Sequence, residues 1–161
     1  MGSIKLHGWD KKPRTPIRSL KVGDIFLMAL SESSYAVGRI LSKLDIGHGV
    51  EFFDLNLSEH EVAAGQIENA EMLAGPVIVD SYWVFDRKPD CDWRIVGHES
   101  GFSPSEGVNA YFSYGGAQYW KIDLFGNQVE ISKREAEELP PYTPQRDAQI
   151  KKWLTPLLKK Q

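Results

Sequence analysis

The sequence has a single cysteine, Cys91, and no apolar run near the roughly 20 residues that a membrane-spanning helix needs. One cysteine excludes an internal disulfide and a zinc site built from several thiolates. The start of the chain carries charges and prolines where a secretory leader would be apolar, so we expect a cytoplasmic protein without a membrane partner. The length of 161 residues fits one compact domain.

Catalytic and cofactor-binding motifs are also missing. None of the four histidines has a second histidine two or four residues further on, so the usual spacing of zinc ligands is absent. The sequence contains no nucleophile elbow, dinucleotide-binding loop or P-loop. Cys91 lies between two aspartates, which disfavour a thiolate. We therefore expect no enzymatic activity, no metal and no cofactor. A hydrolase using His98, which opens a glycine-rich loop, is kept as an alternative.

Charge is distributed in blocks along the chain. Residues 1–21 carry six bases and one acid, residues 45–138 carry 18 acids and six bases, and residues 139–161 return to a net charge of +4. An acidic block of this size attracts a cationic partner and raises its association rate, or else forms a solvated surface that aids solubility. It repels phosphates, so nucleic acid is not the expected partner. A small nucleic-acid- or ligand-binding β-barrel module remains an alternative because of the basic start and the aromatic residues.

The apolar pattern predicts one α+β domain over residues 21–161, preceded by a basic arm at residues 1–20. Runs of β-branched and aromatic residues predict strands at 24–30, 35–41, 50–55, 77–85, 93–97, 110–114, 118–124 and 129–131. Several of these runs are joined by short turns, as in hairpins. We expect a predominantly antiparallel, strongly curved sheet or half-barrel.

Two or three short helices complete the prediction. Ser58 with Glu61, and Ser132 with Glu135, have the spacing of a capping box, and each predicts a short helix. Residues 144–158 predict an amphipathic C-terminal helix, whose apolar residues are Ile150, Trp153, Leu154, Leu157 and Leu158. Pro156 is expected to end or kink this helix near Leu154. We expect its apolar face to dock on the domain, with binding to a partner as the alternative.

Two segments resemble the immunity protein 26 family of bacterial polymorphic toxin systems. Lys21–Phe26 followed by Tyr35–Ile40 is similar to the opening of the family, and Trp93–Gly97 with its loop is similar to a later segment. The similarity covers roughly residues 20–132. It implies a cytoplasmic antitoxin that binds and blocks a cognate toxin, with no catalytic residue to carry over. Trp93 and the opening glycines are interpreted as structural.

The resemblance and the acidic block together predict where the toxin binds. Many toxin domains of such systems are nucleases with cationic surfaces, and an inhibitor needs carboxylates and aromatic anchors opposite them. Two loops carry acids that the predicted fold does not explain. The predicted contact residues are Glu59, Glu61, Glu68, Glu71, Asp86, Asp90, Asp92, Glu99 and Glu106. The sequence leaves the toxin's activity and the oligomeric state open.

Overall fold

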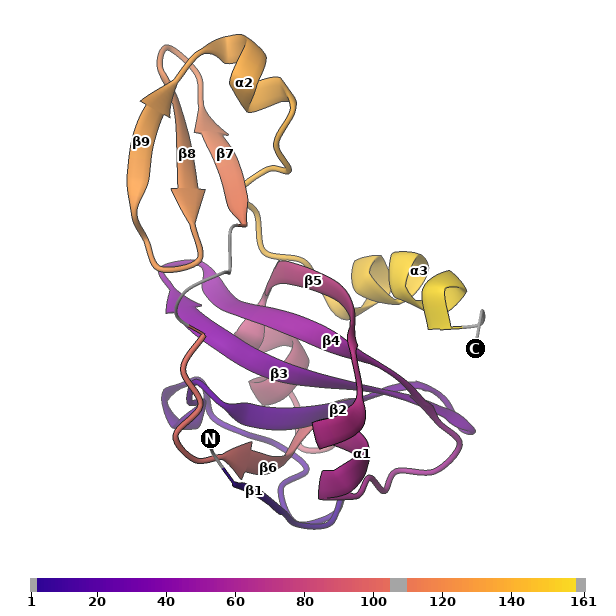
Figure 1. The fold of residues 1–161 in the computed structure, drawn as a ribbon. Coiled ribbons are helices and arrows are strands. Elements are labelled where there is room, and N and C mark those ends of the chain that lie inside the picture. The colour runs from indigo at the N-terminus through magenta and orange to yellow at the C-terminus, as the bar shows by residue number, and fades with distance from the viewer. Residues whose placement is uncertain (1–2, 105–109, 159–161) are drawn as a thin grey trace.

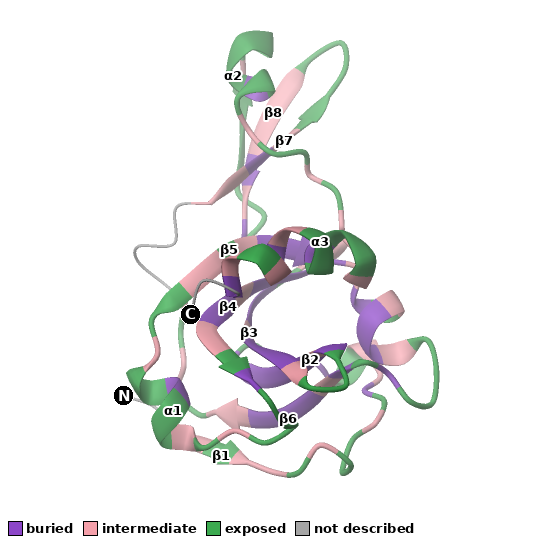
Figure 2. Cartoon of the chain, turned by 90° about the vertical axis from the view of Figure 1, so that its right-hand side faces the viewer, coloured by how far each residue is buried: buried purple, intermediate pink, exposed green. Residues whose placement is uncertain are grey.

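A six-stranded antiparallel sheet forms the body of the molecule in the computed structural model, which describes residues 3–104 and 110–158 (Figure 1). Its strands are β1 (Ile4–Leu6), β2 (Asp24–Ser31), β3 (Ser34–Leu44), β4 (Gly47–Leu57), β5 (Met72–Val79) and β6 (Trp93–Glu99). Their order is β1-β6-β2-β3-β4-β5. The sheet curls so that its strands run around a common interior, but β1 and β5 do not pair with each other (Figure 2). The predicted α+β class with a curved antiparallel sheet is confirmed.

A second, three-stranded sheet projects from one end of this body (Figure 1). It comprises β7 (Tyr111–Gly115), β8 (Tyr119–Asp123) and β9 (Gln128–Ile131). The helices of the described residues are α1 (Ala64–Asn69), α2 (Lys133–Glu137) and α3 (Asp147–Leu158), with single turns η1 (Ile17–Ser19) and η2 (Tyr82–Asp86). The two sheets share a buried cluster that joins Leu41 and Ile78 of the body to Phe112, Ile122 and Leu124. Apolar burial therefore anchors the second sheet, and residues 141–145 add β-bridges to both sheets, at Ser113 of β7 and at Val79 of β5.

Aromatic rings fill the interior of the curled sheet. Phe26 stacks on Trp93 with ring centroids 5.3 Å apart and meets Phe52 and Phe85 edge-on at 5.8 and 5.5 Å. Such pairs add to the free energy of burial because ring edges and faces carry opposite partial charges. Gly38, directly opposite Phe26 on the neighbouring strand, leaves room for that ring, and a Cβ there would overlap it. The predicted structural roles of Trp93 and Gly38 follow from this packing.

The outer face of the sheet is also covered, which explains why β2 is apolar along its whole length. Ile25 and Leu27 point to a second buried cluster, opposite in direction to Phe26 and Met28. The N-terminal segment and α1 pack on this outer cluster. β1, which lies in the segment expected to be an arm, pairs with β6. A strand of three residues is too short to show a period of two in the sequence.

The predicted strand over residues 77–85 is wrong in its second half. β5 ends at Val79, and the chain turns into η2. Asp80 starts this turn: its carboxylate accepts the amide of Trp83 at 3.2 Å, and its carbonyl accepts that of Val84 at 3.1 Å. Val84 and Phe85 then point into the interior cluster. Apolar burial selects the same residue types in a buried helical turn as in a strand, so composition alone could not separate them.

The first predicted helix is also displaced. Residues 58–63 form a loop in which the ring of His60 stacks on Trp9, with centroids 5.9 Å apart. The helix begins later, where the amide of Ala63 donates to the side-chain oxygen of Gln66 at 2.8 Å. A tertiary contact thus replaces the local capping box at this site. The second predicted capping box is confirmed, because Ser132 accepts the amide of Glu135 at 3.1 Å.

The C-terminal helix docks on its own domain. Ile150, Leu154 and Leu158 of α3 are buried in the interior cluster, and the ring of Trp153 meets Phe52 edge-on at 6.0 Å. The amphipathic helix is confirmed, but the predicted end near Leu154 is wrong, since α3 continues through Pro156 to Leu158. A proline removes one backbone hydrogen bond from the last turns, and burial of Leu158 outweighs that loss.

Candidate functional site

A cleft of about 720 Å³ opens beside the second half of α1, and we call it the α1 cleft. It is lined by Ser3, Ile4, Arg39, Phe53, Ile67, Glu68, Asn69, Ala70, Met72 and Glu99. These residues come from β1, β3, β4, β5, β6, α1 and the turn after α1, so the curl of the sheet brings distant segments together. Apolar side chains and carboxylates both face the cleft. Its volume lies in the range of clefts that hold a ligand or an anchoring side chain.

Arg39 organises the inner wall of this cleft. Its Nε and Nη2 donate to one oxygen of Glu51 at 2.9 and 2.6 Å, and its Nη1 donates to Glu99 at 2.9 Å. The guanidinium also lies over the ring of Phe102 at 4.0 Å and near that of Phe53 at 5.1 Å. Three N–H groups of the guanidinium are thereby bound, and two aromatic rings lie against it. Arg39 acts as a fixed cross-link between β3, β4, β6 and the segment that follows β6.

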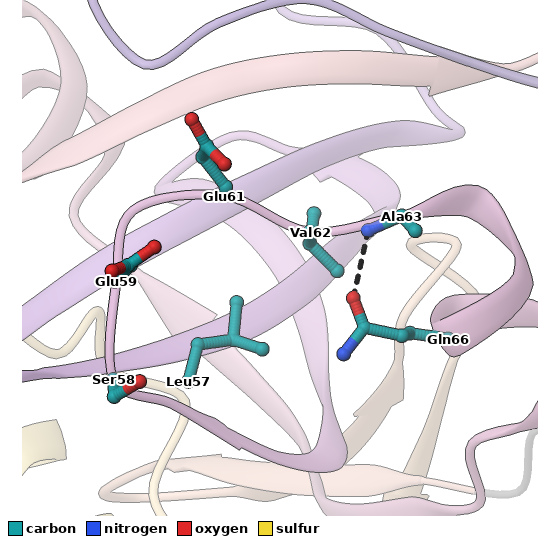
Figure 3. A pocket seen from close by; sticks show the side chains of 7 residues that line it. All are labelled: Leu57, Ser58, Glu59, Glu61, Val62, Ala63 and Gln66. Atoms are coloured by element: carbon teal, nitrogen blue, oxygen red, sulfur yellow. Dashed lines mark hydrogen bonds between the residues drawn. The ribbon is translucent and has the colours of Figure 1, made fainter.

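A second, shallower hollow of about 380 Å³ lies at the other end of α1, and we call it the loop hollow (Figure 3). It is lined by Leu57, Ser58, Glu59, Glu61, Val62, Ala63 and Gln66. Figure 3 shows the apolar side chains of Leu57 and Val62 on the inner side of the loop and the Glu61 carboxylate pointing away from it. The hydrogen bond from Ala63 to Gln66 joins the loop to α1. Carboxylates and apolar side chains therefore line this hollow together, as they do the α1 cleft.

Five of the predicted contact residues lie around α1. Glu59 and Glu61 line the loop hollow, and Glu68 and Glu99 line the α1 cleft. Glu71, which is exposed, directly precedes β5. Among the described residues, the side chains of the other four acids have no ion-pair partner, whereas Glu99 is paired with Arg39. The structure thus brings the first predicted loop and the end of β6 into one acidic surface, which we call the α1 surface: Glu59, Glu61, Glu68, Glu71 and Glu99.

The other predicted acids lie in different surroundings. Asp86 is paired with Arg14 and accepts the amide of Ile17 at 3.1 Å, so it tethers the N-terminal segment. Asp90 and Asp92 are exposed in the turn before β6. That turn and Glu99 are separated by the whole of β6, a strand of seven residues and about 20 Å. The described contact residues therefore form two groups. The first is the α1 surface, and the second is Asp86, Asp90 and Asp92.

Two positive side chains accompany the second group. Arg87 and Lys88 immediately follow Asp86, and both border the same small recess as Asp92. Because these positive charges are so close, they weaken the negative potential that would attract a cationic partner there. Glu106 lies outside the described residues.

His98 forms with Asp24 a histidine–carboxylate pair of the kind that a catalytic site would need. Its Nδ1 lies 2.8 Å from a carboxylate oxygen of Asp24, which also accepts the amide of Lys21 at 2.9 Å through its other oxygen. A histidine oriented by a carboxylate is two-thirds of a nucleophilic triad. Among residues 3–104 and 110–158, no hydroxyl or thiol is hydrogen-bonded to this ring. The pair therefore orients the end of β6 in the structure described.

The most informative residues of the α1 cleft were missed by sequence reasoning. Arg39 is a charged residue inside an apolar strand, and Met72 lies in a segment that the sequence left between a helix and a strand. The signal for Arg39 was available, because a charge within a buried strand must be paired. Its partners could not be identified, since Glu51 and Glu99 are 12 and 60 residues away.

Residues 21–119 match the family model described as Immunity protein 26, which is more than half of the chain. The match identifies the protein as an immunity protein, a class that acts in toxin systems. Within that class, the chain belongs to the Immunity protein 26 family. Except for Ser3 and Ile4, the residues lining the α1 cleft lie inside the matched range, whereas β9, α2 and α3 lie beyond it.

No curated protein and no solved structure matches the chain. In the part of the chain that the structure describes, no helix has the length and apolar character needed to cross a membrane. The same residues contain no group of three or more histidine, cysteine or acidic side chains placed to hold a metal ion.

Proposed function

We propose that this protein is a non-enzymatic antitoxin of the cytoplasm that neutralises one cognate toxin domain by binding it through the α1 surface. Membership of the Immunity protein 26 family supports the class of function. The observation that carries the site is the gathering of Glu59, Glu61, Glu68 and Glu71 around two hollows that also have apolar side chains in their walls. A toxin with a cationic surface, such as a nuclease, is the partner that this surface suits.

The physical basis combines steering with anchoring. Exposed carboxylates raise the rate of encounter with a positive surface, and this effect weakens as salt is added. Apolar side chains in the hollows then slow dissociation, because buried anchors carry most of the binding free energy at an interface. The α1 surface has both components within one short stretch of chain, from Leu57 to Met72.

The first test pairs the protein with its cognate toxin, which is to be sought among the genes next to its own. Co-expression should restore growth of cells that produce that toxin, and the purified proteins should bind with a rate that falls with ionic strength. Changing Glu59, Glu61, Glu68 and Glu71 together to glutamine should lower the association rate at low salt about tenfold or more. Stopped-flow fluorescence or surface plasmon resonance at several salt concentrations measures this rate.

A control pair separates the two acidic groups. Glu68→Gln with Glu71→Gln and Asp90→Asn with Asp92→Asn remove the same number of exposed charges. The first pair should slow association clearly, and the second should change it by less than about twofold, because Arg87 and Lys88 already lower the potential there. The opposite order of effects would move the binding site to the turn before β6. Rescue that is lost in His98→Ala, with binding intact, would favour an enzyme instead.

A further inference from the structure

The α1 cleft contains more than the exposed carboxylates that the proposed function uses. Its apolar side chains differ in exposure: Phe53 and Ile67 are each 2% exposed, while Met72 is 44% exposed. Phe53 and Ile67 form the buried floor of the cleft, and the side chain of Met72 lies at its opening. A methionine side chain is unbranched and polarisable, so it adapts to the shape of whatever it contacts.

The charge in and beside the cleft is negative even though a guanidinium lies there. Arg39 is matched by Glu51 and Glu99, and Glu68 adds a third carboxylate, which gives a net charge of −2. Arg39 offers little to an incoming anion, because three of its N–H groups bind carboxylates and its guanidinium lies against two aromatic rings. An anionic ligand would also approach Glu68 and Glu99 directly. The electrostatics thus select a cation.

We propose that the α1 cleft takes one long cationic side chain, an arginine or a lysine, from the surface of the partner protein. Its aliphatic stem would lie on Ile67 and Met72, and its charged end would reach Glu68 and Glu99. The inference rests on the proposed function and adds the chemistry of the anchor residue. Long basic side chains pack their stems on apolar surface while their charged ends stay hydrogen-bonded, which is the combination that this cleft offers.

Arginine fits the site better than lysine. Its planar guanidinium can donate to two carboxylates at once, and arginine is among the residues that most often dominate binding at protein interfaces. Glu99 already accepts from Arg39 through one oxygen, which leaves its other oxygen for a second guanidinium. The pairing of Glu99 with Arg39 therefore positions this carboxylate rather than removing it from the site.

The decisive experiment introduces a positive charge into the cleft by a substitution in this protein. Met72→Lys places an ammonium in the cleft that Glu68 and Glu99 also line, where it would compete with the partner's side chain. Val129→Lys is the matched control, because Val129 is an exposed apolar residue on β9, 58% exposed, in the second sheet. With the cognate toxin, Met72→Lys should weaken binding at least tenfold and abolish rescue, while Val129→Lys stays within about twofold of the wild type.

The outcomes separate this inference from the proposed function. Wild-type affinity in Met72→Lys, with folding verified by circular dichroism, overturns the cleft as the anchor site. If the glutamine variants of the α1 surface still slow association, the proposed function survives that result. Equal losses in Met72→Lys and Val129→Lys would also refute the cleft, because the effect would then be one of net charge.

A measurement without the toxin tests the same chemistry. Methyl NMR of the free protein would be recorded during titration with acetyl-Leu-Arg-Leu-amide and, separately, with acetyl-Leu-Glu-Leu-amide. The arginine peptide should shift the Met72 and Ile67 methyl signals in a saturable manner, and Glu68→Gln should weaken that response about fivefold or more. A response to the glutamate peptide of equal size would contradict the proposal. A response that survives Glu68→Gln unchanged would contradict it as well.

Discussion

Replacing Arg39 by methionine is expected to lower the free energy of unfolding by about 3–5 kcal/mol. The side chains of Glu51 and Glu99 are only 13% and 17% exposed, and Arg39 is the cation that compensates both. Removing one partner of a part-buried ion pair leaves the desolvation cost of the carboxylates without the attraction that offset it. The contact of the guanidinium with the Phe102 ring at 4.0 Å is lost too. Urea unfolding followed by tryptophan fluorescence measures the change.

Two further variants identify the cause of that loss. Arg39→Met combined with Glu51→Gln and Glu99→Gln should recover part of the stability, since neutral amides cost less to bury than unpaired carboxylates. Arg39→Lys should fall between the wild type and Arg39→Met, because it keeps the charge but cannot serve both carboxylates with a planar fork. A triple variant less stable than Arg39→Met would show that packing of the long side chain, and not charge, dominates at this position.

Acid is expected to destabilise the protein through His48. Burial lowers the pKa of His48 to about 4, the positive charge of Lys43 acts in the same direction, and Asp24 opposes both. Its Nδ1 lies 2.6 Å from the hydroxyl of Ser81, and its Nε2 is buried without a partner among the described residues. A proton added to this ring in the folded state would place an uncompensated charge in the interior, so the ring stays neutral.

The direction of the pH effect follows from these values. The unfolded chain binds a proton at His48 near pH 6.5 and the folded chain only near pH 4, so between these values the unfolded state carries the additional proton. The contribution is complete above pH 6.5 and is lost as the pH falls to about 4. Its size is on the order of 3 kcal/mol, since the two pKa values differ by about 2.5 and one pKa unit corresponds to about 1.4 kcal/mol.

Unfolding curves at pH 7.5, 6.0 and 5.0 would measure this dependence. The wild type should lose stability across the series, and His48→Gln should lose clearly less, although it starts from a lower value because the packing around Ser81 changes. His60→Gln provides the control, since His60 is exposed and should leave the pH dependence as in the wild type. An unchanged slope in His48→Gln would assign the acid lability to other groups.

The architecture was accessible from the sequence because its strongest signals are local. Alternating and apolar runs located β2, β3, β6 and the β8–β9 hairpin, and the spacing of apolar residues located α3. The errors arise where tertiary contacts decide. His60 stacks on Trp9 of the N-terminal segment, and residues 58–63 form a loop instead of the predicted helix. A capping box is worth about 1 kcal/mol, so one good packing contact can replace it.

The candidate site was accessible in part. Counting charges located the acids, but it could not show which of them already have partners. Asp86 binds Arg14 across 72 residues of sequence, and Glu99 binds Arg39 across 60. Pairing at such separations is set by the course of the whole sheet rather than by a local pattern. The apolar floor of the α1 cleft was hidden for the same reason, since Phe53 and Ile67 are also typical core residues.

The docking of α3 has a consequence for how the molecule is made. Its Ile150, Leu154 and Leu158 complete the interior cluster, yet they lie beyond the residues that the family model covers. During synthesis the strands of the body leave the ribosome before α3, so the part of the interior that Ile150, Leu154 and Leu158 cover stays uncovered until this helix emerges. A chain halted after the matched range would have the residues of the α1 surface but an incomplete core. The docking of α3 therefore sets the moment at which the interior of a newly made molecule is closed.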